Sequence, residues 1–126
     1  MKRKIGIMAD CFQVDILEGI RKAAKLGADA VQIYVGGRGA VAERWTKDYR
    51  DTVRKTLQDS GLAVSAMCGD MGGHGFGLAK DNGWRIEETA RMMALTRELG
   101  CDILTTHIGV IPPDSAHPRY AVLQDA

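Results

Sequence analysis

Two four-residue segments of the chain follow the same pattern, and this repeat constrains the fold more than any other feature. Leu26-Gly27-Ala28-Asp29 and Leu99-Gly100-Cys101-Asp102 each join the end of a helical pattern to the start of an apolar run. Gly61 precedes a third apolar run in the same way. The three junctions are roughly 35 to 40 residues apart, the length of one strand–helix unit. Such units predict an α/β fold with a parallel sheet and right-handed crossovers.

Four short apolar runs are the predicted strands. They are rich in isoleucine, valine and alanine and are bounded by glycine or charged residues, as is typical of strands that are buried on both faces. The predicted strands span residues 4–9, 29–35, 62–67 and 102–107.

Helical patterns fill the segments between these runs. The first follows Asp15, a typical N-cap residue, and the second opens at Thr46. The glycine-rich segment that contains CGDMGGHGFG, residues 68–84, is predicted to be an irregular loop. The expected helices span residues 16–26, 46–60 and 85–99, with a fourth from residue 119 onward.

These units are compatible with two architectures, a small open doubly wound sheet and the first half of a (β/α)8 TIM barrel. A complete barrel needs roughly 250 residues, about twice the 126 residues of this chain. The sequence also stops where a fourth helix begins. We therefore expect residues 1–126 to form a single half-barrel domain with about four strands and three to four helices, truncated relative to a full TIM barrel.

The composition of the chain excludes several classes of partner. Lysine and arginine total 17 against 16 aspartates and glutamates, a net charge of +1, so no strong field attracts nucleic acid or anionic lipid. No apolar run is long enough to cross a bilayer, so we expect no membrane association. The three cysteines have no C-x-x-C spacing, which indicates reduced thiols in a cytoplasmic protein.

Ligands of parallel α/β folds bind beyond the carboxyl ends of the strands, so the candidate site residues are those near the predicted strand ends. His107 ends the fourth strand after two threonines, and we favour substrate binding over a purely structural histidine. Asp70 and His74 lie in the glycine-rich loop, where backbone freedom lets polar groups approach a small ligand. The alternative is that this loop is only flexible. Tyr34 and Cys68 lie at the ends of the second and third strands and complete the set.

Other motifs point to chemistry less strongly. Cys11 and Cys68 lie near strand ends, but no base is identifiable beside either thiol, so inert thiols are favoured over nucleophiles. The turn Gly36-Gly37-Arg38-Gly39 offers backbone amides and one guanidinium to a phosphate, or is simply a turn. No H-x-x-E, H-E-x-x-H or clustered carboxylate motif is present, so no metal site is assigned within the chain.

Four segments cover nearly the whole chain: KIGIMADCF, KLGADAVQIY, GLAVSAMCGDMGGHGF and LGCDILTTHIGVIPPD. Together they resemble the amino-terminal half of the xylose isomerase-like TIM barrels, the group of sugar phosphate isomerases and epimerases that also includes endonuclease IV-type enzymes. The last segment is the most specific. Its His107-Ile108-Gly109 matches the H-x-G pattern that members of this superfamily often place at the end of strand four.

The resemblance implies a metal-assisted proton transfer next to the carbonyl group of a sugar or sugar phosphate, through an enediolate. In the family, the residues that bind the divalent ion (Mn, Mg, Co or Zn) and the acid–base carboxylates come from later strands. We therefore expect that this chain alone binds no metal, carries no catalytic residue and is inactive, with its five candidate residues contributing to substrate binding.

Two alternative functions remain open. An abasic-site endonuclease would use the strand-four histidine as a zinc ligand, but the near-zero net charge argues against it, as does Gln32-Ile33-Tyr34, where another histidine would be expected. The other alternative is a non-catalytic small-molecule-binding or assembly module of flavodoxin-like shape. Because half a barrel leaves its first and last strands unpaired, we also expect a homodimer.

Overall fold

A computed structural model of the chain describes residues 3–126, and its centre is a parallel four-stranded sheet. The strands follow one another across the sheet in chain order, β1-β2-β3-β4, without a reversal. In a doubly wound sheet the order reverses at a switch point, so the observed order is that of a barrel segment. The strands are β1 (Gly6–Met8), β2 (Ala30–Tyr34), β3 (Ala63–Cys68) and β4 (Leu104–Thr105).

Helices alternate with the strands, as the repeat predicts. Asp15 caps α1, because its carboxylate accepts hydrogen bonds from the N–H groups of Leu17 at 2.9 Å and Glu18 at 3.2 Å. Thr46 caps α3 through a 3.3 Å hydrogen bond from the N–H of Tyr49. The helices are α1 (Ile16–Lys25), α2 (Ala40–Glu43), α3 (Lys47–Ser60), α4 (Ala79–Glu98) and α5 (Pro118–Asp125), with a 3-10 turn, η1, at Ala9–Phe12.

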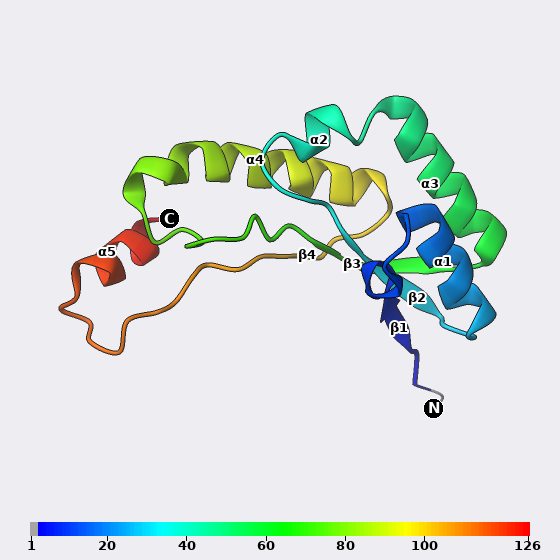
Figure 1. Cartoon of the computed structure of the whole chain (residues 1–126), viewed down its shortest axis with the longest axis horizontal. Helices are drawn as coiled ribbons and strands as arrows, with labels where there is room; N and C mark the ends of the chain where they lie inside the picture. Colours follow the sequence, from blue (N-terminus) through cyan, green and yellow to red (C-terminus); the bar gives the residue numbers. More distant parts are fainter. Residues whose placement is uncertain (1–2) are drawn as a thin grey trace.

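The hydrophobic core lies between the sheet and the helices on one of its sides (Figure 1). Alternate residues of β2 and the residue after it, Val31, Ile33 and Val35, are fully buried there. Trp45 closes the core beside them and donates a 3.0 Å hydrogen bond from Nε1 to the Val35 carbonyl oxygen. The helices contribute Ile16, Ile20, Ala23, Val53, Leu57, Met92 and Leu95, and Leu99 joins them directly after α4.

The other face of the sheet is open. Met8 is 38% exposed, and Ala63 and Ser65 are also exposed. A β-bulge interrupts the pairing of β2 with β3 between Val31 and Gln32. Bulges bend a sheet and increase its twist, which is the curvature that a barrel wall requires.

Four elements differ from the sequence-based expectation. Strand β1 is Gly6–Met8 rather than residues 4–9, since the 3-10 turn η1 begins at Ala9. Helix α4 begins at Ala79 rather than near residue 85, because Asp81 in its first turn pairs with His74 and so stabilises a turn that contains the unfavourable Gly83. Strand β4 is only Leu104–Thr105, since it has β3 on one side and no described strand on the other. The short α2 lies between residues 35 and 46, where the sequence predicted neither a helix nor a strand.

No helix within residues 3–126 has the length and apolarity needed to span a membrane.

Candidate functional site

The carboxyl ends of β2 and β3 bring Tyr34, Cys68 and Asp70 together. Tyr34 and Cys68 are direct partners across the two parallel strands. The Tyr34 hydroxyl donates a hydrogen bond to the backbone oxygen of Asp70. Its backbone N–H donates to Asp10 Oδ2, 2.8 Å away, so the segment after β1 also reaches this point. Three of the five residues predicted for the site are therefore neighbours at one edge of the sheet.

The segment after β3 is ordered by its own hydrogen bonds. Asp70 Oδ1 accepts from the N–H of Gly72 at 2.8 Å, which closes a tight turn. The carbonyl oxygen of Gly72 accepts from Arg85 Nη2 at 3.2 Å, so α4 supports the same turn. The loop therefore presents Asp70 in a defined position beside Tyr34.

The environment of Tyr34 keeps its phenol neutral. Burial is the largest cause that raises its pKa above the ordinary value of 10.0, and the negative charges of Asp70, Cys68 and Asp10 raise it further. Near neutral pH the hydroxyl therefore keeps its proton, which it donates to the Asp70 carbonyl oxygen, while the phenol oxygen can still accept, as can the carboxylates of Asp10 and Asp70. These acceptors suit a polar, uncharged donor such as a sugar hydroxyl.

Two further polar residues face the open side of the sheet, and their pairing was not predicted from the sequence. Gln32 Nε2 donates to Thr105 Oγ1 at 3.3 Å, across β3 from β2 to β4. The Thr105 hydroxyl donates in turn to the carbonyl oxygen of Met67, also at 3.3 Å. The alternation of Gln32 and Tyr34 with Val31 and Ile33 in β2 did indicate a polar face of the sheet. A contact between side chains of β2 and β4, however, requires the curvature of the sheet.

His74 contacts α4 rather than Tyr34. Its Nε2 lies 2.8 Å from Asp81 Oδ2, and both side chains are 30% exposed. Its Nδ1 is buried with no hydrogen-bond partner in the described part of the chain. The contact joins the glycine-rich loop to the first turn of α4, so His74 helps to order the loop that carries Asp70.

His107 lies beyond β4, in an exposed segment. Its side chain makes no hydrogen bond or ion pair with residues 3–126, so it is free to meet a ligand. The segment itself is held in place, because Ile108 accepts a 2.9 Å backbone hydrogen bond from Phe76. Gly75 and Gly109 touch there, and a Cβ on either would overlap the other loop's backbone.

The metal-donor side chains that the structure describes do not form a metal site. Within residues 3–126, no three histidine, cysteine, aspartate or glutamate side chains come together in a way that could hold an ion. Asp10 and Asp70 contribute to one end of the site, while His74 is bonded to α4. These residues alone do not fit the divalent ion that the family resemblance implies, and we assign no reaction step to a metal on this chain.

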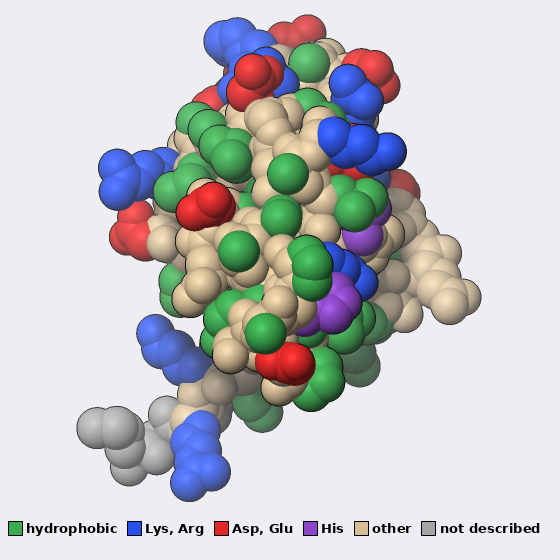
Figure 2. All heavy atoms as spheres, turned by 90° about the vertical axis from the view of Figure 1, so that its left-hand side faces the viewer, with side chains coloured by type: hydrophobic (Ala, Val, Ile, Leu, Met, Phe, Trp, Pro, Cys, Tyr) green, Lys and Arg blue, Asp and Glu red, His purple; other side chains and the backbone are tan. Residues whose placement is uncertain are grey.

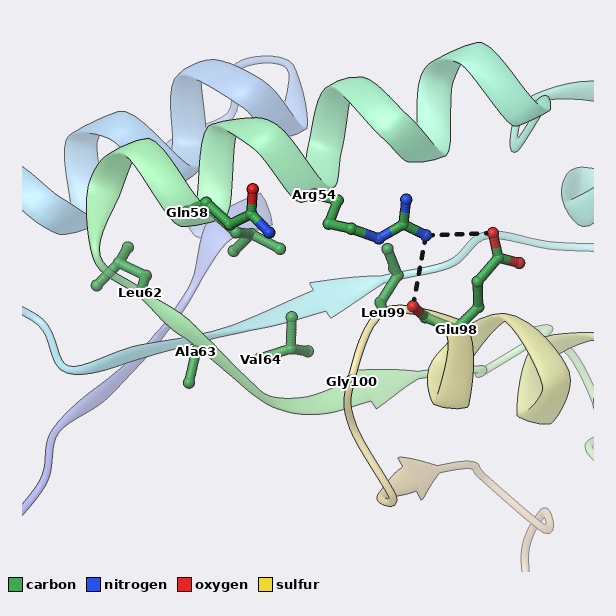
Figure 3. Close-up of a pocket in the computed structure, with 9 residues that line it drawn as sticks. Arg54, Gln58, Leu62, Ala63, Val64, Glu98, Leu99 and Gly100 are labelled. Carbon is green, nitrogen blue, oxygen red and sulfur yellow. Dashed lines mark hydrogen bonds and ion pairs between the residues drawn. The ribbon is translucent and has the colours of Figure 1, made fainter.

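A separate pocket of about 300 Å³ lies at the opposite edge of the sheet, near the amino ends of β3 and β4 (Figure 3). Its polar rim is already paired, because Arg54 Nη2 lies 3.3 Å from Glu98 Oε1. Leu62 and Ala63 line it where β3 begins, and Gly100 lines it before β4. This pocket lies between α3 and the end of α4. Ligand sites of barrel enzymes lie at the carboxyl ends of the strands, so it is not the candidate site.

Figure 2 looks onto the end of the molecule that carries the β3–α4 loop, the β4–α5 loop and α5. Hydrophobic side chains are spread over this surface between histidines and a few charged groups (Figure 2). The segment after His107 contributes Ile108, Val110 and Ile111, which are 45%, 71% and 58% exposed. The candidate site is therefore bordered on the β4 side by apolar surface.

Comparison with known proteins identifies the fold. Residues 20–126 match the sequence model of a family described as xylose isomerase-like TIM barrel. No curated protein matches the sequence. Several solved structures match the fold, among them a xylose isomerase domain protein from Planctomyces limnophilus, with a TM-score of 0.69 and 21% identity over 94% of this chain.

Two other structures give the same result. One is a D-psicose 3-epimerase determined in the presence of D-fructose, with a TM-score of 0.66 and 19% identity over 98% of this chain. The other is a sugar phosphate isomerase/epimerase from Parabacteroides distasonis ATCC 8503, with a TM-score of 0.63 and 17% identity over 98% of this chain. The present chain spans 45% to 47% of the length of the three structures. The prediction of a partial TIM barrel is confirmed.

Proposed function

The chain belongs to the xylose isomerase-like TIM barrel family, and from that premise we propose that it forms one side of the substrate-binding mouth of a sugar isomerase or epimerase. The substrate is a sugar or sugar phosphate, and the reaction moves a proton beside its carbonyl group through an enediolate. The observation that carries the proposal is the contact of Tyr34 with Asp70 at the carboxyl ends of β2 and β3.

The residues of the mouth are suited to binding hydroxyl groups. A sugar hydroxyl both donates and accepts hydrogen bonds, so its site needs both kinds of partner. Asp10, Asp70 and the phenol oxygen of Tyr34 supply acceptors, and the second N–H of Gln32 Nε2 supplies a donor. Gln32 and Thr105 extend the polar surface along the open face of the sheet. His107, exposed and without a partner in the described chain, borders the mouth beyond β4.

The proton transfer itself is assigned to groups outside these 126 residues. A divalent ion, when bound in the complete enzyme, would polarise the carbonyl group of the sugar. The donors within residues 3–126 do not form a set for such an ion. We therefore expect the isolated chain to bind sugars weakly and not to turn them over.

A titration of the ¹⁵N-labelled chain with D-fructose tests this function. The amide signals of Tyr34 and Asp70 should shift, and Tyr34→Phe, which removes only the hydroxyl, should weaken binding. Tyr120→Phe on α5 is the matched control and should leave binding unchanged. Shifts confined to the Arg54–Glu98 pocket, or no shifts at all, would contradict the proposal and favour a non-catalytic module with another ligand.

We further propose that the isolated chain forms a homodimer. The edges β1 and β4 have no further strand beside them within residues 3–126, and Met8 and Ile103 near these edges are 38% and 55% exposed. A second copy would cover this surface. Light scattering should give twice the monomer mass, and a monomer at all concentrations would contradict the proposal.

The three free cysteines, Cys11, Cys68 and Cys101, support placing the protein in the cytoplasm.

A further inference from the structure

The turn of residues 36–39, which joins β2 to α2, has no role in the site described above. Its four backbone N–H groups donate no hydrogen bond to any residue between 3 and 126. The N–H groups just outside the turn are satisfied: that of Val35 donates to Cys68 at 2.8 Å, and that of Ala40 donates to Gly37 at 3.1 Å. The N–H of Val41 donates to Glu88 Oε1 at 3.4 Å. Four consecutive free amides in a turn are the donor arrangement that binds anions.

Arg38 adds a free positive charge to this turn. Its side chain is exposed, and its guanidinium carbon lies 4.8 Å from the centre of the Trp84 ring. It has no ion pair with a carboxylate in the described part of the chain. The cation–π contact holds the guanidinium near the turn without neutralising its charge, which leaves it able to pair with a ligand.

A second guanidinium lies over the same indole. The guanidinium carbon of Arg85 is 4.7 Å from the Trp84 ring centre, and Arg85 is only 5% exposed. Nη2 donates to Gly72, but Nε is buried with no partner, and no carboxylate oxygen within residues 3–126 lies within 4.0 Å of the group. Buried charges in proteins are normally paired, so Arg85 makes the surroundings of Trp84 positive.

Two acidic residues lie near the turn, and they differ in availability. Glu88 is 2% exposed and already occupied, with Oε1 accepting from Val41 and Oε2 lying 2.9 Å from Arg91. Glu43 is exposed, and its Oε1 lies 3.2 Å from the position that a Cβ on Gly39 would take. Glu43 is therefore the one acidic side chain placed to compete with an anion at the turn.

We propose that the turn of residues 36–39, with Arg38, binds the phosphate group of a phosphorylated sugar. This inference deepens the proposed function and rests on it for the sugar part. The turn begins two residues after Tyr34, so it lies on the same edge of the sheet as the mouth. The mouth is acidic through Asp10 and Asp70, whereas the turn is basic, so the phosphate lies at the turn and the sugar hydroxyls lie at the mouth. Arg85 is a positioning residue, because it contacts the Trp84 ring and the Gly72 carbonyl oxygen and not the ligand.

A phosphate fits this turn better than a carboxylate does. The turn offers four amide donors together with a guanidinium, and a phosphate monoester has three oxygens outside its ester bond that can accept from them. A carboxylate has two oxygens, which a single guanidinium fork already satisfies. The number of free donors therefore indicates the phosphate.

The test is an NMR titration of the full 126-residue chain with inorganic phosphate, D-fructose 6-phosphate, D-fructose and D-glucuronate. Phosphate and D-fructose 6-phosphate should shift the amide signals of residues 36–39. Arg38→Ala should weaken phosphate binding about tenfold, the effect of losing a charge-assisted contact of roughly 1.4 kcal/mol. Glu43→Gln should strengthen it, a gain that unfolding cannot produce. The control is Arg97→Ala, which removes a different exposed arginine, on α4, and should leave phosphate binding unchanged.

The outcomes separate this inference from the proposed function. Shifts at residues 36–39 with phosphate, but none at Tyr34 with D-fructose, would support the phosphate site and overturn the sugar mouth. Shifts at Tyr34 with D-fructose, but none at the turn with phosphate, would support the sugar mouth and overturn the phosphate site. Equal affinity for D-glucuronate, or an Arg38→Ala variant that is folded and binds phosphate as well as the parent chain, would overturn the phosphate site.

Discussion

The two faces of the sheet are built from the same strands but differ in burial and polarity. On β2, Val31 and Ile33 point into the helix layer and are fully buried, while Gln32 and Tyr34 alternate with them and face the open side. The buried face is apolar throughout, and the open face carries hydrogen-bonding groups and exposed Met8. Stability therefore depends on one face and recognition on the other, so substitutions on adjacent residues should affect different properties.

Ile33→Ala should have the largest effect on stability. It removes buried methyl and methylene groups from the helix-facing core and leaves a cavity, which costs about 2 to 5 kcal/mol of unfolding free energy. Gln32→Ala, one residue away on the open face, should cost less than about 1 kcal/mol, since its hydrogen bond is exposed. Urea denaturation of both variants measures the difference. Equal losses would mean that the open face is packed in solution.

Gly75→Ala should have the next largest effect, through the contact between the β3–α4 and β4–α5 loops. A Cβ there would overlap the backbone of Ile108 and Gly109. Gly72→Ala is the matched control, because Gly72 has a similar left-handed φ, +67° against +58°, and no atom lies within 4 Å of the position that its Cβ would take. Both variants lose about 1 kcal/mol to backbone strain, and Gly75→Ala should lose at least a further 1 kcal/mol to the overlap. Denaturation curves that coincide would show that the two loops are not in contact.

Thr105→Val tests the polar network of the open face and should have a smaller effect. The substitution keeps the shape of the side chain but removes the hydroxyl that accepts from Gln32 and donates to Met67. The expected loss is about 0.5 to 1 kcal/mol. Thr106→Val, next to it and exposed, is the control. If both variants unfold at the same urea concentration, the network contributes nothing to stability.

The smallest expected effect is a pH dependence at Tyr34. Because its pKa is raised in the folded chain, the folded state holds the phenolic proton more tightly than the unfolded state does. The resulting stability is complete below the ordinary pKa of 10.0 and is lost as the pH rises through the folded pKa. Absorbance titration of tyrosinate should lose its most alkaline step in Tyr34→Phe and keep it in Tyr120→Phe. An unchanged profile in Tyr34→Phe would contradict the assignment.

The sequence predicted the repeated units well because local periodicity and capping determine them. Asp15, Thr46 and the apolar strand runs depend on neighbours a few residues away. Prediction from the sequence failed where residues far apart in the chain determine the bounds of an element. The early start of α4 depends on the contact of Asp81 with His74, and the short β4 depends on which strand lies beside it.

The candidate site shows the same division. Strand ends located Tyr34, Cys68 and Asp70 correctly at one edge, since parallel strands align their carboxyl ends. The link of Gln32 to Thr105 could not be inferred, because two residues on non-adjacent strands meet only when the sheet curves. The roles of Tyr34, Cys68, Asp70, His74 and His107 in substrate binding remain predictions.

The chain-order arrangement of the strands has a consequence for how the protein is made. Gly6 pairs with Ala30, Ala30 with Ala63, and Met67 with Leu104, so every strand docks on one that the ribosome has already released. Each docking step closes a loop of roughly 25 to 40 residues, and none waits for a distant carboxyl-terminal partner. The sheet can therefore be assembled strand by strand during translation, with the growing edge always the most recently synthesised one.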